Sequence, residues 1–447
     1  MKLSELKNIV RGEWVGDDAE FTRVVIDSRI VQAGDCFFAI KGEFFDGHDF
    51  IASVEEKNAA VVIVDREIQT RIPQIRVANT HQALKVLAQF YRENTAIPVA
   101  AITGSCGKTT VRALLENILK QQHAVLASQK SFNNDIGLPL TLLQLKPSHD
   151  VIVLEIGTNH PGEIAALTAI AKPTVAAVTL AAPVHIAHFE TVEAIAREKG
   201  ALFEGLASDG IAVMNADDLY ADLWKTLAGD RRVITFGRNK KSDVMARDVE
   251  FNVAGQATFN LLFSDQSVKV TLPLLGEHNV MNALCASAMA LALNVPLEEI
   301  KIGLETAQPE YGRLIEKKGL FGATVIDDSY NANPLSVKAA ITLLLHRSSH
   351  SILVLGDMGE LGDQADFFHS DIGRFAKSAG LEKIFCYGKY SIKTAHAFGK
   401  NAQHFENHQA LIDALKKSLT SDTTVLVKGS RSMQMEKVVE ALISVSE

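Results

Sequence analysis

A glycine-rich stretch between two apolar segments carries residue types suited to binding a polyphosphate. Residues 100–110 have the sequence AAITGSCGKTT, in which an apolar run leads into a turn and then into a predicted helix over 111–120. Such a turn points backbone N–H groups and the positive end of the helix dipole at phosphate oxygens. We expect Lys108 to reach the β- and γ-phosphates of ATP and the Thr109 hydroxyl to bind Mg²⁺. Because Ile102 stands where the strict phosphate-loop pattern has its first glycine, a simple turn with a surface lysine stays open as the alternative.

A single carboxylate follows the next strongly apolar segment. Residues 150–154 have the sequence DVIVL, and Glu155 comes directly after them. A glutamate at the end of a hydrophobic strand is costly to bury unless it meets a cation, and opposite a phosphate loop that cation is Mg²⁺. On its own, Glu155 is equally consistent with an exposed residue at a strand end. The magnesium interpretation depends on Thr109 as the partner ligand.

His185 and Lys199 form a third candidate pair. His185 lies in the segment 184–189, VHIAHF, and Lys199 lies in a predicted helix over residues 190–205. Taken alone, such a histidine more often packs or lies in a loop, and such a lysine is more often solvated. The local pattern therefore does not make either residue a ligand.

Clusters of Asn, Asp, Gly and Ser recur at predicted strand ends and helix starts. They occupy residues 133–139, 276–282, 327–334, 356–362 and 427–432. Open α/β sheets bind ligands at the carboxyl ends of their strands. Turns and helix caps use the same residue types, so each cluster is as consistent with a structural role as with a functional one.

The elements that must position these residues are short apolar strands alternating with helical periods. The predicted strands are 99–103, 150–156, 174–180, 211–215, 352–355, 383–387 and 424–427. Strands that are apolar on both faces belong inside a parallel sheet covered by helices. The sequence therefore predicts an α/β fold with mostly parallel sheets and right-handed crossovers.

The length of 447 residues exceeds what one hydrophobic core usually serves, and three domains are predicted. The first, residues 1–94, contains predicted strands at 24–27, 36–40 and 60–64. The second, residues 95–312, carries the phosphate loop, an alternating segment at 242–273 that indicates an antiparallel insertion, and a helix at 279–293. The third domain is residues 313–447, and residues 306–313 are the expected linker and hinge.

Composition limits the classes of partner. The chain has 53 acidic and 45 basic residues and a net charge of −8, which disfavours nucleic acid and anionic membranes as partners. The most apolar stretch, residues 164–187, is interrupted by Lys172 and Pro173, which argues against membrane insertion. The first residues lack the apolar core of a signal peptide, so we expect a cytoplasmic protein. The four cysteines are dispersed and are expected to be reduced packing residues.

Taken in order, these motifs resemble the Mur ligases, and the resemblance covers nearly the whole chain. Residues 103–110 match the family loop T-G-[ST]-x-G-K-[ST]-[ST], with Cys106 at the variable position. Further matching segments are NNDIGLP at 133–139, EIGTNHPGEI at 155–164, MNAD at 214–217, DDSYNANP at 327–334, GDMGELG at 356–362 and VKGSRS at 427–432. Together they are most similar to members that add D-alanyl-D-alanine to UDP-N-acetylmuramoyl-tripeptide.

The resemblance implies a three-domain architecture and an activity. It implies a central P-loop ATPase domain, an N-terminal α/β domain for the UDP-linked substrate, and a C-terminal Rossmann-like domain that binds D-Ala-D-Ala and closes over ATP. The implied reaction is amide formation through an acyl phosphate, with ATP, two Mg²⁺ ions and a carbamylated lysine at Lys199.

Residue roles follow from the matching positions. The resemblance implies catalytic roles for Lys108, Lys199 and His185, and metal binding by Thr109, Glu155, His185 and Lys199. The residues implied in ATP binding are Gly104, Ser105, Cys106, Gly107, Lys108, Thr109, Thr110, Asn134, His278, Asn282, Arg313, Asp328 and Asn331. One departure is the segment TLAAPV at 179–184, where relatives often carry asparagine before the histidine.

The substrate residues implied by the resemblance lie in all three domains. They are Ser28, Arg29, Lys41, Gly42, Asp46, His48, Asn133, Asn159, His160, Tyr330, Asn333 and Lys428. Those of the first domain are similar to family segments that hold the uridine diphosphate end. A pyrophosphate there needs backbone amides and a cation such as Arg29 or Lys41.

Two alternatives stay open. One is another ligase of the same superfamily, such as a folylpolyglutamate synthase-type enzyme or the ligase that adds the diamino acid. The other is a P-loop switch or binding module that uses ATP only for conformational change. A monomer is expected in either case.

Overall fold

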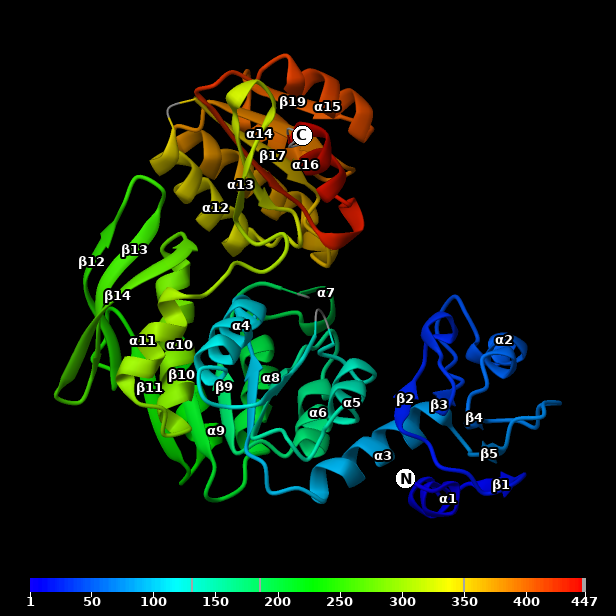
Figure 1. The fold of residues 1–447 in the computed structure, drawn as a ribbon. Coiled ribbons are helices and arrows are strands. Elements are labelled where there is room, and N and C mark those ends of the chain that lie inside the picture. Colours follow the sequence, from blue (N-terminus) through cyan, green and yellow to red (C-terminus); the bar gives the residue numbers. More distant parts are fainter. Residues whose placement is uncertain (130–131, 185, 349, 444–447) are drawn as a thin grey trace.

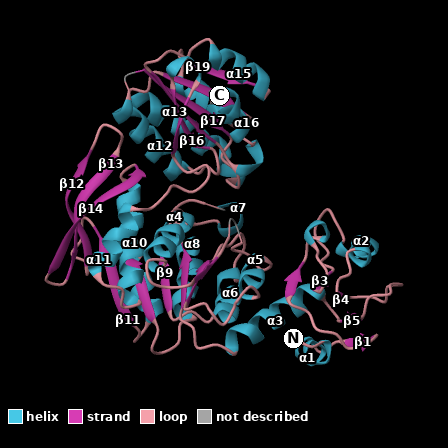
Figure 2. Ribbon diagram, viewed as in Figure 1, coloured by secondary structure: helices cyan, strands magenta, loops and turns pink. Residues whose placement is uncertain are grey.

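Three α/β units follow one another along the chain, each built around its own sheet. The computed structural model describes residues 1–129, 132–184, 186–348 and 350–443. Figures 1 and 2 show the first unit beside the second and the third packed above the second. The predicted three-domain α/β architecture is confirmed. Each sheet falls inside one of the three predicted segments, and the exact boundaries between domains stay a prediction.

The N-terminal unit has a five-stranded sheet in the order β1-β5-β4-β3-β2, in which β2 to β5 are parallel. Its elements are α1 (Leu3–Val10), β1 (Glu13–Val15), β2 (Arg23–Val25), η1 (Ser28–Ile30), β3 (Asp35–Phe38), η2 (Gly47–Phe50), α2 (Ile51–Glu56), β4 (Val61–Val64), β5 (Gln74–Arg76) and α3 (Thr80–Glu93).

Helix α3 connects the N-terminal unit to the central one (Figure 1). It begins where the Asn79 side chain accepts a hydrogen bond from Gln82 N, and it buries an apolar face that includes Leu84 and Leu87. Near its end, the buried Arg92 donates from Nε to Ala171 O at 2.9 Å and from Nη2 to Lys172 O at 2.9 Å. These bonds fix the end of α3 on the central unit.

The central unit has a nine-stranded sheet in the order β14-β13-β12-β11-β10-β9-β6-β8-β7. Its elements are β6 (Val99–Thr103), α4 (Lys108–Leu119), β7 (Val125–Ala127), α5 (Gly137–Leu142), β8 (Val151–Glu155), α6 (Glu163–Ala171), β9 (Val175–Val178), α7 (Ile186–Phe189), α8 (Val192–Glu204), β10 (Ile211–Asn215), α9 (Ala221–Ala228), β11 (Arg232–Gly237), β12 (Val244–Phe251), β13 (Gln256–Phe263), β14 (Gln266–Leu275), α10 (His278–Ala292) and α11 (Leu297–Glu305).

Both faces of the central sheet are covered around β6, β8 and β9, which explains why these strands are buried along their whole length. Along β6, Ala100 and Ile102 pack into a cluster with helices α4, α10 and α11, while Val99 and Ala101 pack into another with α5, α6, α8 and α9. Strands β6 to β11 are parallel, and β12 to β14 form the predicted antiparallel insertion at one edge. The phosphate loop therefore leaves the middle of a rigid sheet.

The C-terminal unit has a six-stranded sheet in the order β15-β16-β20-β17-β18-β19. Helices α12, α13 and α14 cover one face, and α15 and α16 cover the other. Its elements are β15 (Ile315–Lys318), η3 (Leu320–Gly322), β16 (Thr324–Asp328), α12 (Pro334–Arg347), β17 (His350–Gly356), η4 (Gly362–Gln364), α13 (Ala365–Ser378), β18 (Lys383–Tyr387), α14 (Ser391–Phe398), β19 (Ala402–Phe405), α15 (His408–Lys416), β20 (Thr423–Lys428), η5 (Arg431–Met433) and α16 (Glu436–Leu442).

The predicted strands are present with ends shifted by at most two residues, whereas β1, β5, β7, β11, β15, β16 and β19 were not predicted. Helix α4 begins at Lys108, three residues before the predicted start, because the loop glycines place the following residues directly in the first turn. Strand β16 was not predicted, since its sequence TVIDD ends in two aspartates and resembles a polar turn. Among the described residues, no helix combines the length and apolarity needed to cross a membrane.

Candidate active site

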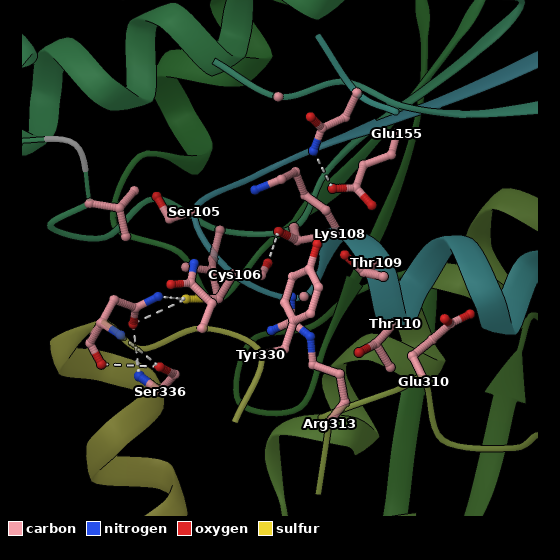
Figure 3. A pocket seen from close by; sticks show the side chains of 18 of the residues that line it. Ser105, Cys106, Lys108, Thr109, Thr110, Glu155, Glu310, Arg313, Tyr330 and Ser336 are labelled. Carbon is pink, nitrogen blue, oxygen red and sulfur yellow. Dashed lines mark hydrogen bonds between the residues drawn. The ribbon is translucent and has the colours of Figure 1, made fainter. Parts of the chain in front are cut away.

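A cavity of about 860 Å³ lies where the central and C-terminal units face each other, and Lys85 on α3 reaches its edge. Its size is in the range of pockets that hold a nucleotide or a similar ligand. Figure 3 shows Lys108, Thr109 and Glu155 near one another, and in this view Tyr330 is drawn between Lys108 and Arg313. Three units of one chain therefore contribute to a single pocket.

The phosphate loop requires glycine at two positions. Gly104 and Gly107 have φ angles of +149° and +86°, which side chains rarely adopt. A Cβ atom would lie 1.8 Å from Thr179 Oγ1 at position 104 and 2.3 Å from Asn282 Oδ1 at position 107. Lys108 Nζ donates to the carbonyl of Gly104 at 2.7 Å, so its ammonium group is held over the loop. The local geometry is that of a polyphosphate-binding loop.

Glu155 is buried with an unsatisfied oxygen. Its Oε1 accepts a hydrogen bond from Asn133 Nδ2 at 2.8 Å, while Oε2 has no hydrogen-bond partner among the described residues. The exposed strand-end alternative is wrong, because Glu155 is only 3% exposed. A buried carboxylate oxygen without a partner costs about 1–3 kcal/mol or more. Because Thr109 lines the same pocket, the donor set fits a magnesium ion.

Lys199 lies in the interior of the site, not on the surface. Its side chain on α8 is 2% exposed, so a solvated helix lysine is excluded. Burial, with a smaller contribution from the nearby Lys108 ammonium, lowers the pKa of Lys199 to about 7, although Cys106 and Glu198 act in the opposite direction. A large fraction of this amine is therefore neutral and nucleophilic near neutral pH. His185, the predicted partner at the metal, lies outside the described residues.

The C-terminal wall is built from two neighbouring strand ends. Asp328 ends β16 and Lys428 ends β20, and the two residues are paired across these parallel strands. The buried Lys428 Nζ donates to Asp328 Oδ2 at 2.6 Å and to Asn331 O at 2.9 Å. The Arg313 guanidinium lies 4.6 Å from the ring centroid of Tyr330. The wall is thus polar, charged and internally bonded.

One contact joins the phosphate loop directly to the C-terminal unit. Asn333 Nδ2 donates to Cys106 Sγ at 3.1 Å, and Cys106 Sγ donates to Asn333 Oδ1 at 3.4 Å. The Asn333 side chain also caps α12 by accepting from Ser336 N at 2.9 Å. The N-terminus of α12 is therefore in direct contact with the phosphate loop.

The predicted linker is held to the phosphate-loop helix by a buried cation. Arg112 on α4 is 6% exposed at its side chain and donates to Glu310 Oε1 of the linker at 2.5 Å. It also pairs with Glu116 one turn along α4. The linker position therefore depends on the helix that carries Lys108.

We expect Arg112→Met to lower the free energy of unfolding by about 2–4 kcal/mol, because two carboxylates lose a buried partner. Thermal or urea denaturation of both proteins measures this difference. Arg197→Met is the matched control, since Arg197 makes an exposed pair with Glu193 at 3.9 Å and should change stability by less than about 0.5 kcal/mol. Equal stability of wild type and Arg112→Met would contradict this role.

The pocket gathers most of the predicted site residues. Those on its wall are Ser105, Cys106, Gly107, Lys108, Thr109, Thr110, Asn133, Asn134, Glu155, Asn159, His160, His278, Asn282, Arg313, Asp328, Tyr330, Asn331, Asn333 and Lys428. Gly104, which belongs to the phosphate loop, and Lys199, which lies close to Cys106 and Lys108 of that loop, are not among the wall residues.

The six predicted substrate residues of the N-terminal unit lie away from this pocket. Ser28 and Arg29 follow β2, whereas Lys41, Gly42, Asp46 and His48 follow β3, so both groups lie at the carboxyl edge of parallel strands. Arg29 is exposed and bonded to Asp27. His48 is buried, with Nδ1 2.6 Å from Asp46 Oδ1 and Nε2 accepting from Asp65 N. Both ring nitrogens of His48 are therefore already engaged within the unit.

Several charged wall residues were not among the predicted site residues. Lys85, Glu310 and Arg431 line the pocket. Lys85 is a charged residue on an amphipathic helix, and Glu310 lies in the linker. Nothing in the local sequence around either residue therefore indicated a place in the site. Arg431 stands inside the VKGSRS segment that the sequence did single out, and its charge was the available signal.

Family models match all three units. The Mur ligase family catalytic domain matches residues 20–92, the Mur ligase middle domain matches residues 102–290, and the Mur ligase glutamate ligase domain matches residues 312–431. The matches follow the order and the extent of the three sheets.

Similar proteins match over nearly their full length. The UDP-N-acetylmuramoyl-tripeptide–D-alanyl-D-alanine ligase of Escherichia coli K12 is 39% identical, with 98% of each chain covered. A crystal structure of MurF from Acinetobacter baumannii has a TM-score of 0.92 at 34% identity, covering 98% of this chain and 97% of that one. MurF from Thermotoga maritima in complex with ADP has a TM-score of 0.82 at 28% identity, covering 94% and 96%.

Proposed function

Because this chain belongs to the Mur ligase family, we propose that it joins D-alanyl-D-alanine to UDP-N-acetylmuramoyl-tripeptide at the expense of ATP. The products are the UDP-linked pentapeptide, ADP and phosphate, in the synthesis of peptidoglycan precursors. The observation that carries the proposal is one pocket in which the phosphate loop, Glu155 and the C-terminal wall face one another. The full-length relatives support the identity of the substrates.

The residues of the phosphate loop hold and polarise the triphosphate. Lys108 and the loop N–H groups bind its oxygens, which screens the repulsion between triphosphate and the tripeptide carboxylate. The carboxylate takes the γ-phosphoryl group and becomes an acyl phosphate. The free amine of D-Ala-D-Ala then attacks the acyl carbon, phosphate leaves, and the amine loses its proton. Cations and oriented N–H groups of the pocket stabilise the oxyanion of that second step.

Magnesium and a modified lysine complete the proposed site. Glu155 and Thr109 would hold Mg²⁺, and the ion would supply charge neutralisation for phosphoryl transfer. The unsatisfied Glu155 oxygen supports this assignment. We further propose that Lys199 reacts with CO₂ to give a carbamate and a released proton, because its amine is buried and its pKa is lowered. The modification would give Lys199 anionic oxygens able to hold a second Mg²⁺.

The N-terminal unit is the proposed site for the UDP end of the substrate. Its candidate residues lie at the carboxyl edge of β2 and β3, where parallel sheets bind ligands. Lys85 on α3 lies between that unit and the catalytic pocket and forms an ion pair with Asp135 at 2.9 Å. A long substrate can therefore run from the N-terminal unit along α3 to the phosphate loop.

Residues 306–313 are the proposed hinge. An acyl phosphate is hydrolysed by water, so the pocket must open for loading and close for chemistry. The Arg112–Glu310 pair and the Cys106–Asn333 contact stabilise the arrangement in which the two units face each other. A monomer as the working unit and a cytoplasmic location are part of the same proposal.

Amine-dependent phosphate release tests the function. With ATP, Mg²⁺ and UDP-N-acetylmuramoyl-tripeptide, we expect phosphate to appear when D-Ala-D-Ala is added and not when D-Ala, D-Glu or a diamino acid is added. A folylpolyglutamate synthase-type enzyme or a diamino acid ligase would respond to the single amino acids instead. A P-loop switch would release phosphate without any carboxylate acceptor. Absence of D-Ala-D-Ala-dependent release would overturn the proposal.

A further inference from the structure

Two loop segments of the C-terminal unit form a polar part of the active-site pocket wall. Strand β20 lies between β16 and β17, although it follows β19 in the chain, so the strand order reverses beside it. The segments that follow β17 and β20 therefore leave the sheet side by side at its carboxyl edge, which is where α/β sheets bind ligands. Gly359, Glu360, Ser430, Arg431 and Ser432 from these two segments line the active-site pocket.

The two segments are held rigidly. Ser430 donates to Asp357 O from its backbone N at 3.0 Å and from Oγ at 2.7 Å, which ties the segment after β20 to the segment after β17. The Asp357 carboxylate accepts from Tyr390 N and Ser391 N, and so it caps α14. The segment after β17 is also held by the fully buried His369, whose Nε2 accepts a hydrogen bond from Met358 N at 3.0 Å. Residues carried by these segments are thus presented from a fixed scaffold.

Arg431 differs from the other cations on the C-terminal side of the pocket. Lys428 is buried and already bonded to Asp328 and to Asn331 O. The Arg313 side chain lies over the Tyr330 ring. Arg431 is 60% exposed, and its partner among the described residues is Glu436, reached through Nη1 at 2.9 Å. Since a guanidinium has five N–H donors in a planar fork, Glu436 orients it and leaves donors for a carboxylate.

We propose that Arg431 binds the terminal carboxylate of the incoming dipeptide and selects amines that carry it. This inference rests on the proposed function. An extended dipeptide spans about 7 Å. Its amine must reach the acyl carbon at the phosphate loop, so its carboxylate must meet another part of the pocket wall. Arg431 lines the same pocket from the C-terminal unit, in a net acidic protein that would otherwise repel the anion. Binding there fixes the amine for attack.

The test compares two amines on two proteins. Wild-type protein should use D-alanyl-D-alanine with a kcat/KM about 10- to 100-fold higher than D-alanyl-D-alaninamide, because the amide lacks the charge that a guanidinium binds. In Arg431→Ala, kcat/KM for D-alanyl-D-alanine should fall by about the same factor, mainly because KM rises. The variant should then have similar kcat/KM values for the two amines. Its KM for ATP should not change. Arg431→Lys should recover part of the preference, since it restores the charge without the fork.

Arg374→Ala is the matched control. Arg374 on α13 is also an exposed arginine but does not line the pocket, so this variant should have wild-type kcat/KM with both amines. The thermal unfolding temperature of Arg431→Ala should match that of wild type. The inference is overturned if Arg431→Ala keeps the full preference for the dipeptide, or if its kcat/KM falls by the same factor with both amines. If the wild-type protein releases no phosphate with the dipeptide, the proposed function fails and the role of Arg431 fails with it. The two failures are therefore distinguishable.

Discussion

Lys108→Ala is expected to reduce phosphoryl transfer by about 10²- to 10³-fold or more, while binding of the UDP-linked substrate stays within about twofold of wild type. Lys108 is the ammonium group held over the phosphate loop, with Nζ 2.7 Å from Gly104 O. Without it, the repulsion between the substrate carboxylate and the triphosphate is less screened, so the barrier to forming the acyl phosphate rises. The candidate nucleotide-sugar residues lie in another unit and do not contact Lys108.

Two measurements separate these effects. Phosphate release measures the chemical step, and calorimetric titration with UDP-N-acetylmuramoyl-tripeptide measures binding. Lys120→Ala is the control, because Lys120 follows the same helix, is 54% exposed at its side chain and pairs with Glu116 away from the loop. Equal loss of turnover and of binding in Lys108→Ala would show that the N-terminal assignment is wrong.

The features that could be predicted from the sequence are those encoded locally. The phosphate loop is a continuous segment whose glycines are required by their own backbone angles and by their contacts with Thr179 and Asn282. The strands β6, β8 and β10 are apolar on both faces because helices cover both sides of the sheet. Such requirements leave a visible pattern in a short stretch of residues.

Features that depend on the tertiary arrangement could not be predicted from local patterns. Lys199 has the sequence context of a solvated helix lysine, and only the packing of α8 beneath the loop buries it. The Arg112–Glu310 pair joins residues 198 positions apart. Arg431 stood in a recognised motif, but its exposure and its place on the pocket wall follow from the position of β20 between β16 and β17.

Lys199→Arg is expected to lower turnover by about 10²-fold or more, although it keeps the positive charge. Arginine stays protonated and does not form a carbamate, so the site would hold a buried cation where the proposed site has an anionic ligand. Lys225→Arg on α9 is the control, because Lys225 is an exposed lysine and the same substitution should leave turnover unchanged. Lys199→Ala should be as inactive as Lys199→Arg, since both lack the carbamate.

The modification itself gives a readout that is independent of turnover. Carbamate formation consumes the neutral amine and CO₂ and releases a proton, so it is favoured as pH rises through the Lys199 pKa of about 7 and lost below it. Protein equilibrated with ¹³C-bicarbonate at pH 8 should show a carbamate carbon signal by NMR that disappears reversibly at pH 6. The signal should persist in Lys225→Arg and be absent in Lys199→Arg. A Lys199→Arg protein with wild-type turnover, or a carbamate signal unaffected by that substitution, would show that the buried amine acts in another way.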